Sequence, residues 1–236
     1  VKWAHAILDN WESLQGEIAT RRNTWGRLTG HLSVGVIPSA LPMMAVMTQA
    51  IQSRHPEIEL TVLSQSSIEI LRNLEDFTID IGLTYLDNEP IEGMRSEEVY
   101  LERYCLLARP DHTLADEAAV TWAEAARQPL CLLTPDMQNR RIIDSLFHAA
   151  GARPEPTLES NSMIVLFSHV RTGRWASVMP EKLASTLGLT EQLRSIPIVE
   201  PEAVHQIGLV VPPREPMTPL VSALVAEASH LASKMN

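Results

Sequence analysis

The sequence predicts an α/β protein in which a long N-terminal helix precedes two doubly wound, Rossmann-like subdomains joined by two crossovers. Three observations support this prediction. Apolar residues recur at steps of three and four over residues 1–29. Short apolar strands then alternate with helical segments from residue 30 onward, and the alternation resumes after residue 104. The chain ends in a strand and a helix that find no partner near the second unit.

The first 29 residues predict a helix that pairs two copies of the chain. Their apolar residues form one narrow seam with polar flanks, broken only by Arg21. A helix of this kind cannot bury its seam alone, so it needs a second helix. We therefore expect a homodimer or a homotetramer. The predicted dimerisation residues are Ile7, Trp11, Leu14, Ile18, Trp25 and Leu28.

The next segment predicts the first α/β unit, with a parallel sheet and right-handed crossovers. Ser66 and Glu69 have the spacing of a capping box at the start of its second helix. The third strand is apolar nearly throughout, which is typical of a strand covered on both faces. The expected strands are residues 32–36, 58–62 and 79–83, and the expected helices run over residues 41–55 and from residue 66.

The second unit repeats this alternation. Thr134 and Pro135 predict an N-cap followed by a proline at the first helical position. Thr218 and Pro219 predict the same start for the last helix. The expected strands are residues 104–108, 130–133, 176–179 and 207–211, and the expected helices include residues 120–126, a helix around residues 142–147, and residues 162–172.

The economical arrangement returns the final strand and helix to the first unit. Residues 1–29 then form the dimerisation helix, residues 30–101 and 203–236 form subdomain I, and residues 102–202 form subdomain II. Strand ends and helix N-termini converge in a cleft between two such units, which makes the cleft a natural site for a small molecule.

Composition narrows the partners. A net charge of −10 argues against direct contact between this chain and a nucleic acid backbone. Cys105 and Cys131 lie in apolar runs without metal-site or redox spacing, so two buried strand thiols are expected, with no metal or cofactor. The apolar stretches are too short to cross a membrane, and the start lacks the pattern of a secretion signal. We therefore expect a cytoplasmic protein.

Hydroxyl and amide side chains gather where strands end and helices begin. Free N–H groups at a helix N-terminus attract an anion, so the set suits a small anionic effector. Each serine or threonine alone is equally explained as a helix cap, and the capping box already explains Ser66. The imidazole of His205 could add positive charge. The predicted effector-binding residues are Ser39, Ser66, Ser67, Thr84, Thr134, Ser160, Asn161 and His205.

A series of short motifs resembles the effector-binding domain of LysR-type transcriptional regulators, in the right order from residue 30 to the end. The motifs are GHLSVG at residues 30–35, LP at 41–42, HPEIEL at 55–60, IDIGL at 79–83, RPDHTLA at 109–115, FHAAG at 147–151, VRTG at 170–173, VMP at 178–180 and IGLV at 207–210.

The resemblance implies a periplasmic-binding-protein-like fold that binds a small metabolite in its cleft. It also implies an upstream winged helix–turn–helix domain. DNA would be a partner only through that domain. Three residues depart from the family pattern. Gln65 and Phe77 stand where glycines are usual, and Trp175 replaces the second glycine of a Gly-x-Gly motif. Gln65 and Trp175 lie near the expected cleft, although Trp175 also fits core packing.

Two other classes of function share this clamshell fold. A solute-binding protein of a transport system would behave as a monomer, and the N-terminal pairing helix counts against it. An enzyme would show turnover that disappears when one cleft residue is removed. The sequence has no Gly-rich phosphate loop, nucleophile elbow or close pair of carboxylates, so we expect a binding protein and not an enzyme.

Overall fold

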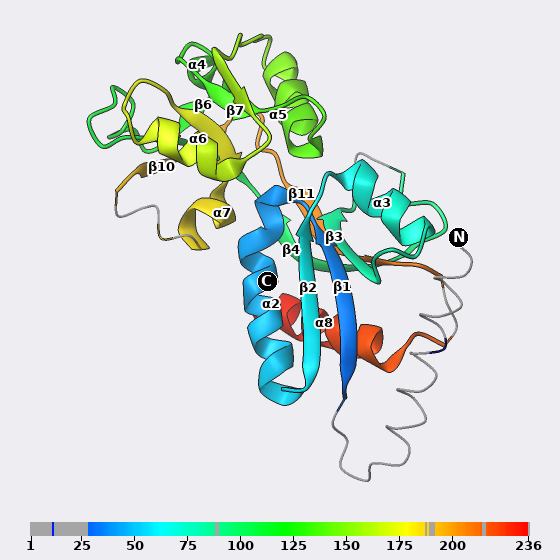
Figure 1. Cartoon of the computed structure of the whole chain (residues 1–236). Helices are drawn as coiled ribbons and strands as arrows, with labels where there is room; N and C mark the ends of the chain where they lie inside the picture. Colours follow the sequence, from blue (N-terminus) through cyan, green and yellow to red (C-terminus); the bar gives the residue numbers. More distant parts are fainter. Residues whose placement is uncertain are drawn as a thin grey trace. The chain divides into compact units, whose positions relative to one another are not determined.

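The computed structural model describes Trp11 and residues 28–87, 90–186, 188, 192–213 and 216–235 (Figure 1). The chain divides into two compact units. Unit 1 comprises Val1–Tyr100 and Gln206–Asn236, and unit 2 comprises Leu101–His205. The chain therefore passes between the units twice, within strand β4 (Arg95–Glu102) and at the start of strand β11 (His205–Val211).

Only part of the predicted pairing helix is described. Trp11 is helical and 58% exposed, whereas Ile7, Leu14, Ile18 and Trp25 lie outside the described residues. The expectation that the helix includes Leu28 is wrong, because Leu28 and Thr29 are irregular. Strand β1 begins directly after them at Gly30, whose φ of 133° is incompatible with a helix. The pairing role of the seam stays a prediction.

Unit 1 is built on a five-stranded mixed sheet of order β2-β1-β3-β11-β4. Strand β1 (Gly30–Val36) pairs in parallel with both β2 (Ile58–Ser64) and β3 (Ile81–Tyr85), as predicted. Strand β11 joins β3 in antiparallel orientation, so the last strand does return to this sheet. Strand β3 starts two residues later than predicted. Strand β4, with four charged residues among eight, was not predicted.

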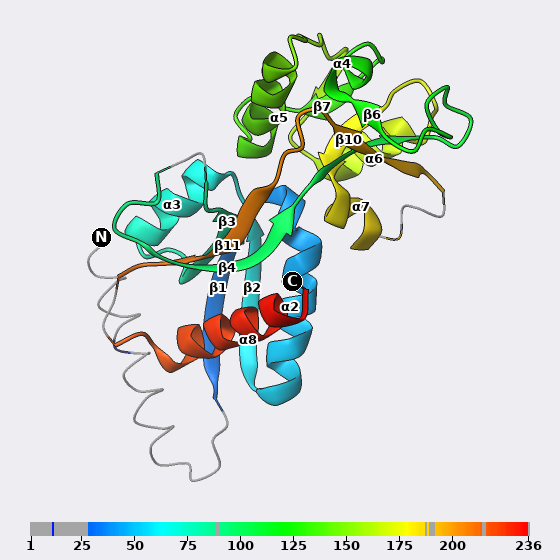
Figure 2. The ribbon, with the colours of Figure 1, turned by 180° about the vertical axis from the view of Figure 1, so that it is seen from behind.

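Helices cover both faces of this sheet. A Cβ atom at Gly30 would lie 3.0 Å from Leu220 of α8 (Pro219–Met235), and one at Gly35 would lie 3.2 Å from Ile70 of α3 (Ser67–Glu75). Residues 30 and 35 face opposite sides of the strand, so α8 and α3 cover opposite faces. Helix α2 (Leu41–Arg54) contacts α8, as both views show (Figures 1 and 2). Unit 1 is therefore doubly wound.

Unit 2 contains a four-stranded sheet of order β6-β10-β5-β9 and a separate parallel pair. Strand β5 runs antiparallel to both of its neighbours whereas β10 runs parallel to β6, so this sheet is mixed. Its strands are β5 (Tyr104–Ala108), β6 (Val120–Thr121), β9 (Ser177–Pro180) and β10 (Arg194–Val199), and the parallel pair is β7 (Cys131–Leu133) with β8 (Leu158–Ser160).

In the described part of unit 2, four helices accompany these strands. They are α4 (Trp122–Ala125), α5 (Gln138–Ala149), α6 (Met163–Val170) and α7 (Glu181–Thr186). The helix predicted from residue 120 is shorter than expected because its first two residues pair with β10 as β6. Thr121 then caps α4 through a capping box with Glu124. Within the described ranges, no helix is both long and apolar enough to cross a membrane.

The end of α3 places Phe77 in an unusual conformation. The Thr78 N–H donates to the Asn73 carbonyl (2.9 Å) and the Phe77 N–H to the Leu74 carbonyl (3.2 Å). These two bonds form a Schellman motif, in which the residue at the Phe77 position is usually glycine. Phe77 has a φ of 56°, in the left-handed region that disfavours a side chain. The sequence departure at this position therefore carries backbone strain.

We expect the free energy of unfolding of the Phe77→Gly variant to exceed that of the Phe77→Ala variant by about 1 kcal/mol. The glycine variant is more stable because only glycine adopts this conformation without a Cβ clash. Urea denaturation of the two variants measures the difference. The comparison with alanine removes the phenyl ring from both proteins, so lost side-chain contacts cancel. A more stable alanine variant would contradict the assignment of strain.

Candidate functional site

The candidate site in unit 1 lies where three parallel strands end. Val36 pairs in register with Ser64, at the last residues of β1 and β2. The Gln65 N–H donates to the Val36 carbonyl (3.0 Å), and the Ile37 N–H donates to the Leu83 carbonyl of β3 (3.1 Å). The segments that follow these strands therefore start beside one another at the carboxyl edge of the sheet.

Ser39 follows β1 and is 3% exposed. It lies in a short 3-10 helix (Pro38–Ala40), and its hydroxyl has no hydrogen-bond partner among the described residues. The alternative that Ser39 is a helix cap is wrong. The residue before the 3-10 helix is Ile37 and the N-cap of α2 is Ala40, and no side chain caps either start.

Two further unpartnered oxygens follow β2. Ser67 is the first residue of α3, is 1% exposed, and its hydroxyl has no partner within the described part of the chain. The Gln65 side-chain oxygen is likewise buried without a partner there, and it lies 2.6 Å from where a Cβ of Gly35 would be. A buried polar atom without a hydrogen bond costs free energy, which a ligand could recover.

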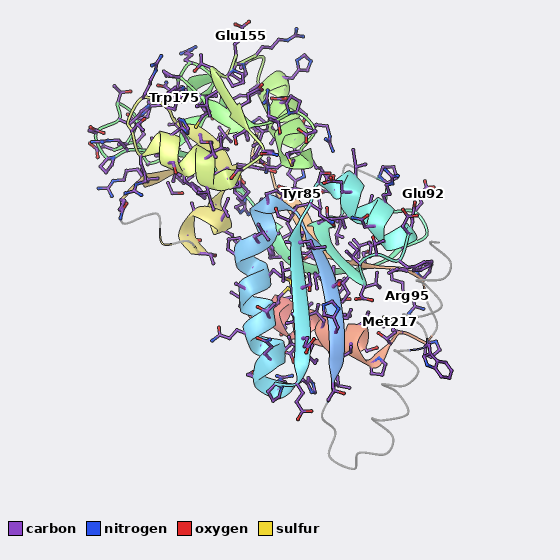
Figure 3. The ribbon with its side chains drawn as sticks, in the orientation of Figure 1. Tyr85, Glu92, Arg95, Glu155, Trp175 and Met217 are labelled. Carbon is purple, nitrogen blue, oxygen red and sulfur yellow. The ribbon has the colours of Figure 1, made fainter. Side chains whose placement is uncertain are left out.

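Ser66 is already engaged, as the sequence predicted. Its N–H and hydroxyl both donate to Glu69 Oε2 (2.8 Å each), and its hydroxyl accepts the Glu69 N–H (3.3 Å). This completes the predicted capping box of α3. Thr84, also predicted to contact the effector, is buried within β3 opposite Gly208 of β11, one residue before the strand ends. Tyr85, labelled in Figure 3, is the last residue of that strand.

In unit 2, Ser160 is the last residue of β8 and Thr134 directly follows the last residue of β7. The Thr134 N–H donates to the Ser160 carbonyl (3.1 Å), directly beyond the register pair of Leu133 and Ser160. The predicted N-cap at Thr134 is wrong, because α5 begins at Gln138 after the N-cap Met137. Thr134 instead opens a turn in which its carbonyl accepts the Met137 N–H (3.0 Å). Its hydroxyl finds no hydrogen-bond partner in the described ranges.

Ser160 and Asn161 precede α6. The Ser160 hydroxyl accepts the N–H of Ser162, which is the N-cap of α6 (3.1 Å). Asn161 is exposed. Both therefore lie at a helix start, as predicted, but the Ser160 hydroxyl already has a partner.

Arg140 connects the ends of β7 and β8 in unit 2. It is buried, and its Nη1 donates to the Leu133 carbonyl (2.6 Å) and to Glu159 (2.5 Å). Leu133 precedes Thr134, and Glu159 precedes Ser160. Burial opposes the charge, but hydrogen bonds to Glu159 and Asp144 outweigh it and raise the pKa of Arg140 above its usual value. Two carboxylates already balance this cation, so it gives the site no uncompensated positive charge.

His205 and Trp175 lie against aromatic neighbours in unit 2. The His205 ring meets Tyr104 edge to face, with centroids 5.9 Å apart. Trp175, labelled in Figure 3, packs against the core of unit 2. Its Nε1–H donates to the Thr157 hydroxyl (2.9 Å). Of its two interpretations, the contacts favour core packing for Trp175. In the part of the chain that is described, no cluster of His, Cys, Asp or Glu could hold a metal ion.

The structure therefore brings Ser39 and Ser67 to one sheet edge of unit 1, and Thr134 and Ser160 to one edge of unit 2. The sequence analysis singled out Gln65 only as a departure from a family pattern. Its position directly after an expected strand could have identified Gln65 as a candidate site residue. Nothing in the sequence indicated the buried network of Arg140.

Known proteins share both the sequence pattern and the fold. The family of the LysR substrate binding domain matches residues 26–232. A probable nitrogen assimilation transcriptional activator of Synechococcus elongatus is 26% identical over 173 residues, which are 72% of this chain and 56% of that protein. The chain thus spans just over half of that relative's length.

Two solved structures show the same fold at low identity. The Corynebacterium glutamicum OxyR C206 mutant has a TM-score of 0.78 and 20% identity, covering 98% of this chain and 72% of that one. The Synechocystis CcmR regulatory domain in complex with 2-PG has a TM-score of 0.76 and 16% identity, covering 88% and 99%. Because the family match extends over most of the chain, the protein belongs to the LysR substrate binding domain family.

Proposed function

We propose that this chain is the effector-sensing part of a transcriptional regulator and that a small anion binds at the carboxyl edge of the unit 1 sheet. The observation that carries the proposal is the pair of unpartnered, buried hydroxyls of Ser39 and Ser67, each three residues from the register pair Val36 and Ser64. Membership of the LysR substrate binding domain family supports an effector role.

The chemistry of this edge favours an anion over a cation. Helix α2 has no acidic residue in its first turn and no side-chain cap, so the positive end of its dipole is uncompensated. The Ser39 hydroxyl lies just before that turn and offers a donor without a partner. A carboxylate would satisfy both features.

The remaining predicted residues complete the proposal. Thr134, Ser160, Asn161 and His205 of unit 2 are likewise proposed as effector-binding residues. The seam of residues 1–29 is proposed to pair two copies of the chain. DNA contact is proposed to belong to another part of such a regulator, because this chain carries a net charge of −10. The relative from Synechococcus elongatus is named as a probable transcriptional activator, which supports this role over transport or catalysis.

A thermal-shift screen of small organic and inorganic anions tests the site. We expect the best hit to raise the melting temperature by linkage. Replacing Ser39 with alanine should weaken its binding about tenfold, or about 1.4 kcal/mol, the usual worth of a hydrogen bond to a charged group. Ser53→Ala is the matched control, since Ser53 lies on α2 and its exposed hydroxyl donates only to the Ala50 carbonyl. Equal binding by the Ser39 variant would overturn the placement.

The two cysteines do not support sensing through a thiol. Both are fully buried, and burial raises the pKa of Cys105 to about 12 and that of Cys131 to about 11. Reaction with peroxide or with a disulfide reagent requires the thiolate. At pH 8 the thiolate fraction of Cys105 is on the order of one in ten thousand.

We therefore expect neither cysteine to react with a disulfide reagent in the native protein, and both to react once urea has unfolded it. The pKa of each thiol falls when burial is lost, so the thiolate fraction rises on unfolding. Absorbance of the released thiolate counts the reacting groups. Rapid reaction of one thiol in the native protein would contradict this and would favour a redox function.

A further inference from the structure

Among the described residues, helices α3 and α4 start with the same capping box, and α3 borders the proposed site. In unit 1, Glu69 accepts the N–H and hydroxyl of Ser66 at 2.8 Å each. In unit 2, Glu124 accepts the N–H and hydroxyl of Thr121 at the same 2.8 Å. Each glutamate places a carboxylate at its helix N-terminus, where it compensates the helix dipole.

The two helix starts at the carboxyl edge of unit 1 therefore differ in charge. Helix α2 has no acidic residue in its first turn, whereas α3 carries Glu69 there. Each start nevertheless holds an unpartnered, almost fully buried serine hydroxyl, Ser39 before α2 and Ser67 in α3. One hydroxyl thus lies beside an uncompensated dipole, and the other lies two residues from a carboxylate.

We propose that Glu69 determines specificity by restricting the ligand to one anionic group. The anion binds at Ser39, and the part of the ligand that faces Ser67 is a neutral hydrogen-bonding group such as a hydroxyl. This inference rests on the proposed function and names its ligand class, a hydroxy acid with a single negative charge. A second carboxylate near Ser67 would meet the like charge of Glu69 and lose affinity.

The charge of Glu69 can be removed while its structural role stays. Glutamine also serves at this position of a capping box, because its side-chain oxygen accepts the same two hydrogen bonds. Glu69→Gln should therefore keep α3 intact. Glu124→Gln is the matched control, since it makes the identical change in an equivalent box of unit 2.

The probes are hydroxy acids and dicarboxylates of equal length, namely 3-hydroxypropionate with malonate, 4-hydroxybutyrate with succinate, and 5-hydroxyvalerate with glutarate. Isothermal titration of the full chain measures both members of each pair. We expect at least one hydroxy acid to bind at least tenfold more tightly than its dicarboxylate. Glu69→Gln should reduce that ratio to threefold or less by improving dicarboxylate binding, and Glu124→Gln should leave the ratio unchanged.

Three results would overturn the inference. The first is a preference for the hydroxy acid that survives Glu69→Gln, and the second is equal binding of both members by the native chain. The third is that no pair binds while the anion screen still yields a hit that depends on Ser39. That result rejects this ligand class and keeps the proposed function. Loss of the Ser39 dependence itself rejects the proposed function as well.

Discussion

The parallel pairing of β1 with β2 is the constraint on which the candidate site depends. Its register runs from Gly30 opposite Ile58 to Val36 opposite Ser64, so both strands end at the same level. Parallel strands require helical crossovers, and each crossover begins at this one edge. The helix starts of α2 and α3, with their serines, are therefore brought to one place by the sheet and not by contacts of their own. Unit 2 uses the same principle in its short pair of β7 and β8.

The elements that the sequence predicted best are those with a strong apolar pattern. Strands β1, β2, β5 and β11 and the capping box of Ser66 could be read directly, because burial or a specific spacing determines each of them. Strands β4, β8 and β10 were missed. They contain charged residues or a proline and alternate weakly, and pairing with neighbours distant in sequence stabilises them. The pairing of β10, antiparallel to β5 and parallel to β6, also makes the sheet of unit 2 mixed.

The candidate residues show a similar limit. Position after a strand was enough to select Ser39, Ser67 and Thr134, but it did not reveal which hydroxyls lack a partner. That property depends on every acceptor nearby, as the contrast between Ser66 and Ser67 illustrates. The Thr-Pro pair at residue 134 misled because it is typical of a turn as well as of a helix start. The burial of Arg140 could not be anticipated, since two of its three partners, Leu133 and Glu159, come from outside its own helix.

The prolines around Ser39 have a consequence for recognition. Pro38 opens the 3-10 helix and Pro42 follows in the first turn of α2, so the backbone on both sides of the serine has its φ angle fixed by a ring. A rigid loop loses little conformational entropy when it is occupied, and preorganisation of this kind strengthens binding without adding a contact. The backbone that carries Ser39 is therefore restricted in conformation before any ligand arrives. At the proposed site, a preorganised backbone of this kind would make selectivity depend on the geometry of the protein and not on its adaptation to the ligand.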